Sequence, residues 1–144
     1  MDGHYSYIKL RLYSLDEGGC HVVVSGLVNG KKATFIVDTG SSKTVLDSNA
    51  VGKYLEGCDK QNLRGKAVTL SEKSIDVEAV TVAEISFGKT VISDCQCVAI
   101  DLSGVQKAYE EFELPPIQGI IGCDLLRSMN AVIDFKTLRM RLSR

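Results

Sequence analysis

The sequence predicts a mostly β protein that forms a single domain over residues 1–144. The chain has only two prolines, turn residues are sparse, and many short runs are rich in β-branched residues. Hydrophobic residues make up 44% of the sequence, so a chain of this length can bury one core without disulfides or metals. We therefore expect one folded unit without linkers or low-complexity segments.

The first third of the chain gives the clearest strand signals. Ile8, Leu10 and Leu12 alternate with charged residues, which predicts a strand with one solvated face. Residues 20–28 and 31–37 flank an Asn-Gly dipeptide, which accepts the positive φ angles of a two-residue hairpin turn. The second strand of this hairpin delivers the chain to an acidic loop.

The later elements alternate between strands and short helices. In chain order we expect a helix capped by Asp47 and ending near Leu55, strands at 67–70, 75–85 and 90–100, a helical turn near 105–112, a strand at 117–121, a helix at 124–129, and strands at 131–135 and 138–142.

Composition excludes several classes of partner. Lys and Arg number 17 against 18 Asp and Glu, and no basic stripe with interleaved aromatics occurs, so nucleic acid is not expected as a partner. No apolar run reaches the roughly 20 residues that a membrane helix needs. The start of the chain shows no export signal. The five cysteines are odd in number and too sparse for a disulfide scaffold, which favours a reducing compartment. We therefore expect no membrane contact and a cytoplasmic location.

The segment 36–42 is the most informative part of the chain. An apolar run ends in Asp38, small residues follow, and the apolar pattern then resumes, so Asp38 is expected at the tip of a tight loop. Gly40 suits backbone angles that other residues avoid. The hydroxyls of Thr39 and Ser41 can hydrogen-bond to the loop and to the carboxylate. This pattern presents a carboxylate at the end of a strand.

These residues carry a family resemblance. FIVDTGSSKTVLD at 35–47 resembles the active-site segment of aspartic proteases, and GIIGCDLL at 119–126 resembles the second signature of their single-domain, retroviral-type branch. The resemblance runs from about Cys20 to Leu142. It implies a retropepsin-like acid protease fold, a closed β-barrel-like domain with one or two short helices. It also implies an aspartic-type endopeptidase that hydrolyses peptide or protein substrates without a cofactor or metal.

Hydrolysis of this kind needs two carboxylates. One takes a proton from water and the other gives a proton to the substrate. Asp101, Asp124 and Asp134 are not presented as Asp38 is, because their spacing or the bulky residues after them do not fit. One chain thus supplies one carboxylate, and a symmetric homodimer that pairs two copies of Asp38 is the simplest solution. Terminal strands at 5–12 and 138–142 would offer edges for a shared sheet.

The resemblance also implies roles for the active-site loop. Asp38 is the acid/base, Thr39 ties the two loops together across the dimer, and Gly40 lets the substrate backbone approach. Ser41 resembles the cellular pepsin-like pattern, and its hydroxyl is expected to donate to the carboxylate.

Further residues are implied for substrate binding. Ile120 and Ile121 would line side-chain pockets, and the loop at Gly122 would shape the site from behind. Gly65, within 63–66, is the best candidate for a glycine-containing flap. Cys123 stands where retroviral enzymes commonly carry Arg.

The sequence leaves alternatives open. Asp38 can be a strand-end residue that caps the next turn, and the Ile-Ile-Gly motif can be a buried strand that ends at glycine. A protease-like fold can also serve as a catalytically silent dimerisation or peptide-binding module. The active protease and the silent module would have the same architecture.

Other motifs are weaker. The stretch 26–32 superficially resembles a phosphate-binding loop, but its spacer is too short and a strand follows it. Cys95 and Cys97 would face one side of a strand, and we expect buried small hydrophobes rather than zinc ligands there. His4 and His21 are expected at the surface or in turns.

Overall fold

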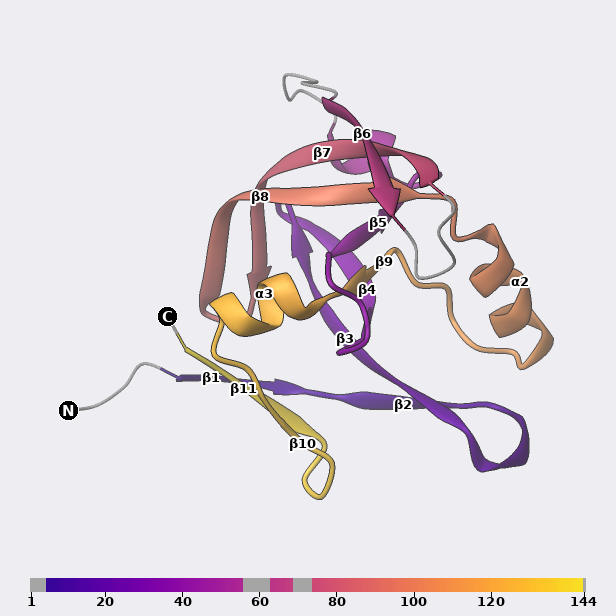
Figure 1. Ribbon diagram of the computed structural model, residues 1–144. Helices are drawn as coiled ribbons and strands as arrows, with labels where there is room; N and C mark the ends of the chain where they lie inside the picture. Colours follow the sequence, from indigo (N-terminus) through magenta and orange to yellow (C-terminus); the bar gives the residue numbers. More distant parts are fainter. Residues whose placement is uncertain (1–4, 56–62, 69–73, 144) are drawn as a thin grey trace.

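A computed structural model describes residues 5–55, 63–68 and 74–143 (Figure 1). In chain order its elements are β1 (Tyr5–Lys9), β2 (Arg11–Ser14), the 3-10 helix η1 (Asp16–Gly18), β3 (Cys20–Val28), β4 (Lys31–Val37), β5 (Val45–Asp47), α1 (Val51–Tyr54), β6 (Leu63–Val68), β7 (Ser74–Phe87), β8 (Thr90–Ile100), α2 (Ser103–Glu111), β9 (Gly119–Ile121), α3 (Cys123–Ser128), β10 (Val132–Asp134) and β11 (Arg139–Ser143).

Six of the strands close into a barrel. They follow the order β3-β4-β9-β5-β8-β7, and a further pairing of β3 with β7 joins the two ends. Most neighbours are antiparallel, but β4 runs parallel to β9 and β5 runs parallel to β8. The prediction of a mostly β, closed-barrel domain with short helices is confirmed.

The first hairpin forms as predicted. Residues 20–28 pair with residues 31–37 through the turn at Asn29 and Gly30, whose φ angles are 48° and 79°. Asn29 also accepts a hydrogen bond from the backbone N–H of Glu84 at 3.0 Å, next to the place where β3 and β7 pair. The turn therefore also helps to close the barrel.

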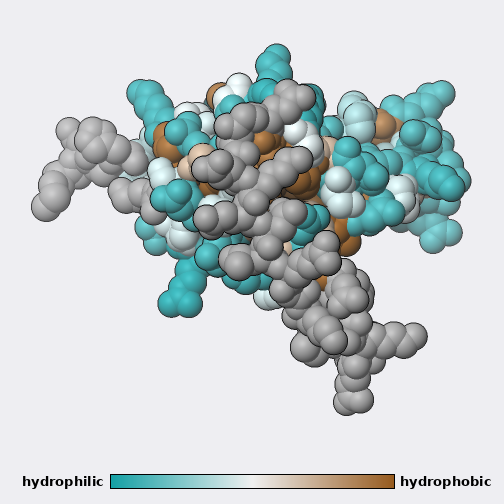
Figure 2. All heavy atoms as spheres, turned by 90° about the horizontal axis from the view of Figure 1, so that it is seen from above, coloured by the Kyte–Doolittle hydropathy of each residue, from teal (hydrophilic) through white to brown (hydrophobic). Residues whose placement is uncertain are grey.

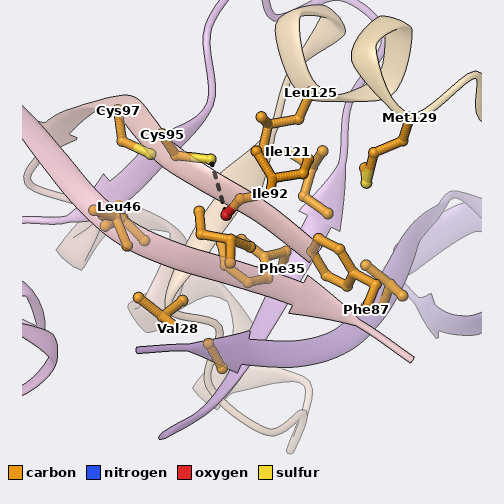
Figure 3. Close-up of a cluster of buried hydrophobic side chains, with 14 of the residues drawn as sticks. Val28, Phe35, Leu46, Phe87, Ile92, Cys95, Cys97, Ile121, Leu125 and Met129 are labelled. Atoms are coloured by element: carbon orange, nitrogen blue, oxygen red, sulfur yellow. Dashed lines mark hydrogen bonds between the residues drawn. The ribbon is translucent and has the colours of Figure 1, made fainter. Parts of the chain in front are cut away.

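Aromatic and aliphatic side chains fill the barrel interior (Figure 3). Phe35 and Phe87 meet edge to face with ring centroids 5.7 Å apart. Gly26 makes room for them, because a Cβ atom there would lie 2.5 Å from the Phe87 ring. In the stretch 26–32, which superficially resembles a phosphate-binding loop, Gly26 thus lies in a strand that packs on an aromatic ring.

Two cysteines belong to this core, as predicted. Cys95 and Cys97 are buried on β8 with their sulfur atoms in the cluster (Figure 3). Burial raises the pKa of Cys97 to about 12, with smaller contributions from Cys95 and Asp124, so this thiol keeps its proton. Both residues pack as small hydrophobes.

The first strand departs from the predicted alternation. Leu10 is buried as expected, but its N–H bonds to the carbonyl of Leu138 and separates β1 from β2. The side-chain pattern changes phase there, so Tyr13 is buried and Leu12 is 40% exposed. The prediction that Leu12 shares the buried face of Ile8 and Leu10 was wrong.

The two ends of the chain form a separate three-stranded sheet of order β1-β11-β10, which we call the terminal sheet. Here β11 pairs with β1 on one side and with β10 on the other. The prediction that residues 138–142 offer a free edge was therefore wrong, and the outer strands are β1 and β10.

The helix after the acidic loop is shorter than predicted. Residues 45–47 form β5, and α1 covers only Val51–Tyr54. Asp47 does not cap this helix directly. Its buried Oδ1 accepts hydrogen bonds from the backbone N–H groups of Asn49 and Leu102, and its Oδ2 accepts one from Gln106 Nε2. This carboxylate joins β5 to α2.

Helix α2 packs on the outside of the barrel through a second apolar cluster. Gln106 reinforces the contact, because its side chain bonds to both backbone groups of Ile117 ahead of β9. None of the described helices is long and apolar enough to cross a membrane. Seen from above, hydrophilic residues form the rim, and hydrophobic residues are visible towards the middle (Figure 2).

We predict that Asp47→Ala lowers the free energy of unfolding by about 2–3 kcal/mol, because it leaves the buried N–H of Leu102 without an acceptor and removes the bonds from Asn49 and Gln106 that join β5 to α2. Urea denaturation measures this change. Asp16→Ala is the control, since Asp16 is exposed and its carboxylate accepts only the N–H of its neighbour Glu17 within the described structure. Equal effects of the two substitutions would contradict the role of Asp47 in joining β5 to α2.

Candidate active site

Asp38 lies directly after β4 at the start of an exposed loop. Its N–H donates to the carbonyl of Ile121 at 3.0 Å, which fixes the loop against the end of β9. Its Oδ1 accepts the N–H of Gly40 at 2.8 Å, and its carbonyl accepts the N–H of Ser41 at 3.1 Å. The loop is a tight turn that holds the carboxylate in place and leaves it accessible.

Ser41 does not act as expected. Its hydroxyl donates to the carbonyl of Lys43 at 2.7 Å, and a hydroxyl has a single proton to donate. The carboxylate of Asp38 instead receives the backbone N–H of Gly40. The prediction of a hydrogen bond from Ser41 to this carboxylate was wrong, and Ser41 stabilises the turn.

A second loop supports the first from behind. The N–H of Cys123 donates to the carbonyl of Ser41 at 2.8 Å, and its Sγ lies 2.9 Å from the carbonyl of Thr39. Gly122 makes this approach possible, since a Cβ atom there would lie 2.6 Å from the carbonyl of Lys43. The glycine at 122 is therefore required by the close contact of two backbones.

A polar network under the two loops was not predicted. The hydroxyl of Thr44 donates to Asp124 Oδ1 at 2.8 Å and accepts the N–H of Gly122 at 3.1 Å. Asp124 Oδ2 also accepts the N–H of Thr44. Asp124 is thus a structural acceptor at the start of α3. The one sequence signal was its position in the first turn of the predicted helix, where carboxylates are favoured.

The two loops belong to halves of the chain that resemble each other in layout. In each half a barrel strand runs into a glycine-containing loop, and β4 and β9, which lead into these loops, lie side by side in parallel. A short helix follows each loop, α1 after the first and α3 after the second. Only the first loop carries the Asp-Thr-Gly sequence.

A cleft of about 380 Å³ opens beside Asp38. Its walls come from β3, β4, β9 and α2, and the lining residues are Cys20, His21, Val22, Ile36, Val37, Asp38, Val105 and Ile120. Its volume and its position next to an exposed carboxylate make it a place where a side chain of a bound peptide could sit.

The other candidate residues are placed differently. Ile120 lines the cleft, but Ile121 is fully buried in the barrel core, so the expectation that it also lines a pocket is not met. Gly65 lies on β6 opposite Val77 of β7. These two strands form a hairpin, and its turn lies outside the described residues, as does His4.

His21 was misplaced by the sequence analysis. It lies on β3, is half-buried, and its Nδ1 is 2.6 Å from the hydroxyl of Tyr109. Its partner comes from α2, and a contact across 88 positions gives no local sequence signal. Within the described residues, no group of three or more His, Cys, Asp or Glu side chains is placed to hold a metal ion.

The fold and the site together define a retropepsin-like class of protein, and solved structures share the fold. A retropepsin-like aspartic protease from Rickettsia conorii matches with a TM-score of 0.62 and 16% identity, over 98% of this chain and 91% of that one. The EIAV protease, solved in complex with the inhibitor HBY-793, matches with a TM-score of 0.57 and 16% identity, over 85% and 98%.

A third structure, the retroviral protease-like domain of Ddi1 from Leishmania major, matches with a TM-score of 0.52 and 16% identity, over 81% of this chain and 82% of that one. No curated protein matches the sequence. The family model described as aspartyl protease matches residues 24–125, which is more than half of the chain. The chain therefore belongs to the aspartyl protease family.

We predict that Gly122→Ala lowers the free energy of unfolding by roughly 1–3 kcal/mol, because the new methyl group presses on the backbone of the Asp38 loop. Thermal or urea unfolding measures it. Gly104→Ala in α2 is the matched control, since a Cβ atom there meets nothing within 4 Å. A similar loss at both positions would show that the contact between the loops is not tight.

Proposed function

We propose that the protein is an aspartic endopeptidase in which two copies of Asp38, one from each subunit of a homodimer, activate the water that hydrolyses a peptide bond. The observation that carries this proposal is the exposed Asp38 carboxylate, held at the end of β4 by the N–H of Gly40 and flanked by a cleft. Membership of the aspartyl protease family supports it.

The chemistry needs one protonated and one ionised carboxylate. The ionised group takes a proton from water as the oxygen attacks the carbonyl carbon, and the protonated group gives its proton to the carbonyl oxygen. Two carboxylates brought close together share one proton, because both cannot be charged at low cost. Among the residues that line the cleft, Asp38 is the single carboxylate, so the second has to come from another copy.

The surroundings of Asp38 support a partner of the same kind. Thr39 is exposed, and its hydroxyl makes no hydrogen bond within the described residues, which leaves it available to the loop of a second chain. A two-fold axis through this loop would bring identical residues together.

The terminal sheet offers an apolar surface for the same contact. Its strands and the turn after β10 carry Tyr5, Tyr7, Val132 and Phe135, which are 45%, 62%, 46% and 62% exposed. Exposed apolar residues gathered on one sheet are typical of a surface that a partner covers. In this proposal the partner is the second copy of the chain.

We predict that Asp38→Asn lowers kcat/KM by about 10²- to 10⁴-fold, because the amide cannot exchange the proton that catalysis requires. Folding should remain intact, since the Asn oxygen still accepts the N–H of Gly40. Peptide cleavage and thermal unfolding measure the two effects. Asp94→Asn, at an exposed position of β8 with φ of 52°, is the control that should retain activity.

The alternative function, a catalytically silent peptide-binding or dimerisation module, makes a different prediction for the same assay. The wild-type protein would then bind peptides but cleave none between about pH 3 and pH 8. Peptides that are bound and released intact by both wild-type protein and Asp38→Asn would decide for the module.

We predict that the rate per chain falls on dilution, because one chain holds half of the site. Initial rates over a concentration series, together with the mass in solution, measure this. Phe135→Lys removes apolar contact from the terminal sheet, so it should raise the protein concentration at which the rate per chain is half-maximal. Phe112→Lys is the control, since Phe112 is 41% exposed at the end of α2, and it should leave this concentration unchanged. A rate per chain that is independent of concentration, with a monomeric mass, would contradict the dimer.

A further inference from the structure

His21 is a polar side chain in the cleft that the proposed hydrolysis does not use. It lies on β3 in the wall of the cleft that also contains Asp38. Its Nδ1 atom is 2.6 Å from the hydroxyl oxygen of Tyr109, a residue of α2. The imidazole is therefore fixed by a contact between the barrel and α2.

Tyr109 is a rigid partner for this histidine. Its side chain is 1% exposed, and its ring meets the edge of Tyr13 with centroids 5.4 Å apart at 70°. Burial, with Tyr13 as a smaller cause, raises the pKa of Tyr109 to about 12, so the phenol keeps its proton at all pH values near neutrality. A rigid, protonated phenol next to Nδ1 determines where the imidazole carries its own proton.

The other ring nitrogen is a donor in both charge states. In the neutral ring, we assign the proton of the Tyr109 hydroxyl to Nδ1, because this hydroxyl has no other acceptor among the described residues, and the single ring proton then lies on Nε2. If the ring takes up a second proton, Nδ1 donates to the oxygen of Tyr109 instead, and Nε2 keeps its proton. Nε2 makes no hydrogen bond within the described part of the chain, so this donor is available for a ligand.

The remaining walls of the cleft are mostly apolar. Val22 and Val37 come from the barrel strands, Ile120 comes from β9, and Val105 comes from α2. A volume of about 380 Å³ is enough for one long side chain of a bound peptide. The cleft thus combines an apolar trough with a fixed hydrogen-bond donor, next to the candidate catalytic carboxylate.

Resting on the proposed protease function, we propose that His21 selects substrates whose side chain beside the scissile bond has an apolar stem and a terminal oxygen acceptor. Glutamine and glutamate fit this description. The stem contacts the valine and isoleucine walls, and the terminal oxygen accepts the proton of Nε2. Methionine has a similar length but lacks the oxygen, and lysine carries donors only. His21 is then a specificity-determining residue, and Tyr109 is a positioning residue.

The test compares paired peptides. The best-cleaved peptide of a random library is made with glutamine, glutamate or methionine at each position beside the scissile bond, and kcat/KM is measured for each. At one of these positions the wild-type enzyme should prefer glutamine over methionine about five- to tenfold, the size of one partly exposed hydrogen bond. His21→Leu should bring this ratio close to one, because kcat/KM falls more for the glutamine peptide than for the methionine peptide.

Two further variants separate recognition from structure. His21→Gln keeps an N–H donor on a side chain of similar reach and should retain part of the preference. Tyr109→Phe keeps the aromatic packing against Tyr13 but releases Nδ1, so the preference should fall to an intermediate value with little change for the methionine peptide. Thermal unfolding of each variant shows that it is folded, and these two remain informative if His21→Leu does not fold.

Several outcomes would overturn the proposal that His21 forms a specificity subsite. One is a wild-type ratio near one at every position, and another is an equal loss for all peptides in the His21 variants, which would indicate backbone anchoring or a purely structural role. If no peptide is cleaved, the proposed function fails separately. The subsite is then tested by calorimetry with the tightest-binding peptide of the same library, made with glutamine, glutamate or methionine at each position. A glutamine preference in binding that His21→Leu abolishes would support it, whereas equal or absent binding would refute it.

Discussion

The contact between two backbone loops is the constraint on which the rest of the site depends. Asp38 donates its N–H to the chain at Ile121, and Cys123 donates its N–H to the carbonyl of Ser41. These bonds require the loops to approach more closely than any side chain at position 122 would allow. The position of the carboxylate is thus set by main-chain geometry, and the neighbouring side chains stabilise that geometry.

The barrel provides this contact through its parallel pair of strands. Because β4 and β9 run side by side in the same direction, both loops leave the barrel at the same edge. Thr44 and Asp124 then fill the space beneath them with hydrogen bonds. A change in the strand register would move both loops and would separate Gly122 from the backbone that it touches.

Local signals predicted what depends on neighbours in sequence. The Asn29-Gly30 turn, the buried β8 cysteines and the helix near 124–129 all follow from patterns of a few residues, and the structure contains them. The Asp-Thr-Gly motif located the loop. Two of the errors occurred where distant segments decide the outcome. The carbonyl of Leu138 accepts the N–H of Leu10 and so interrupts the first strand. The imidazole of His21 contacts Tyr109, which lies 88 positions away in the sequence.

The pairing of the chain ends has a practical consequence for any altered form of this protein. Tyr5 and Ser143 are cross-strand partners, so the polypeptide enters and leaves the domain at one corner, as Figure 1 shows. An affinity tag or fused domain at either end would therefore crowd the same sheet. Moving a tag from one end to the other would not relieve such crowding, whereas removal of the tag would.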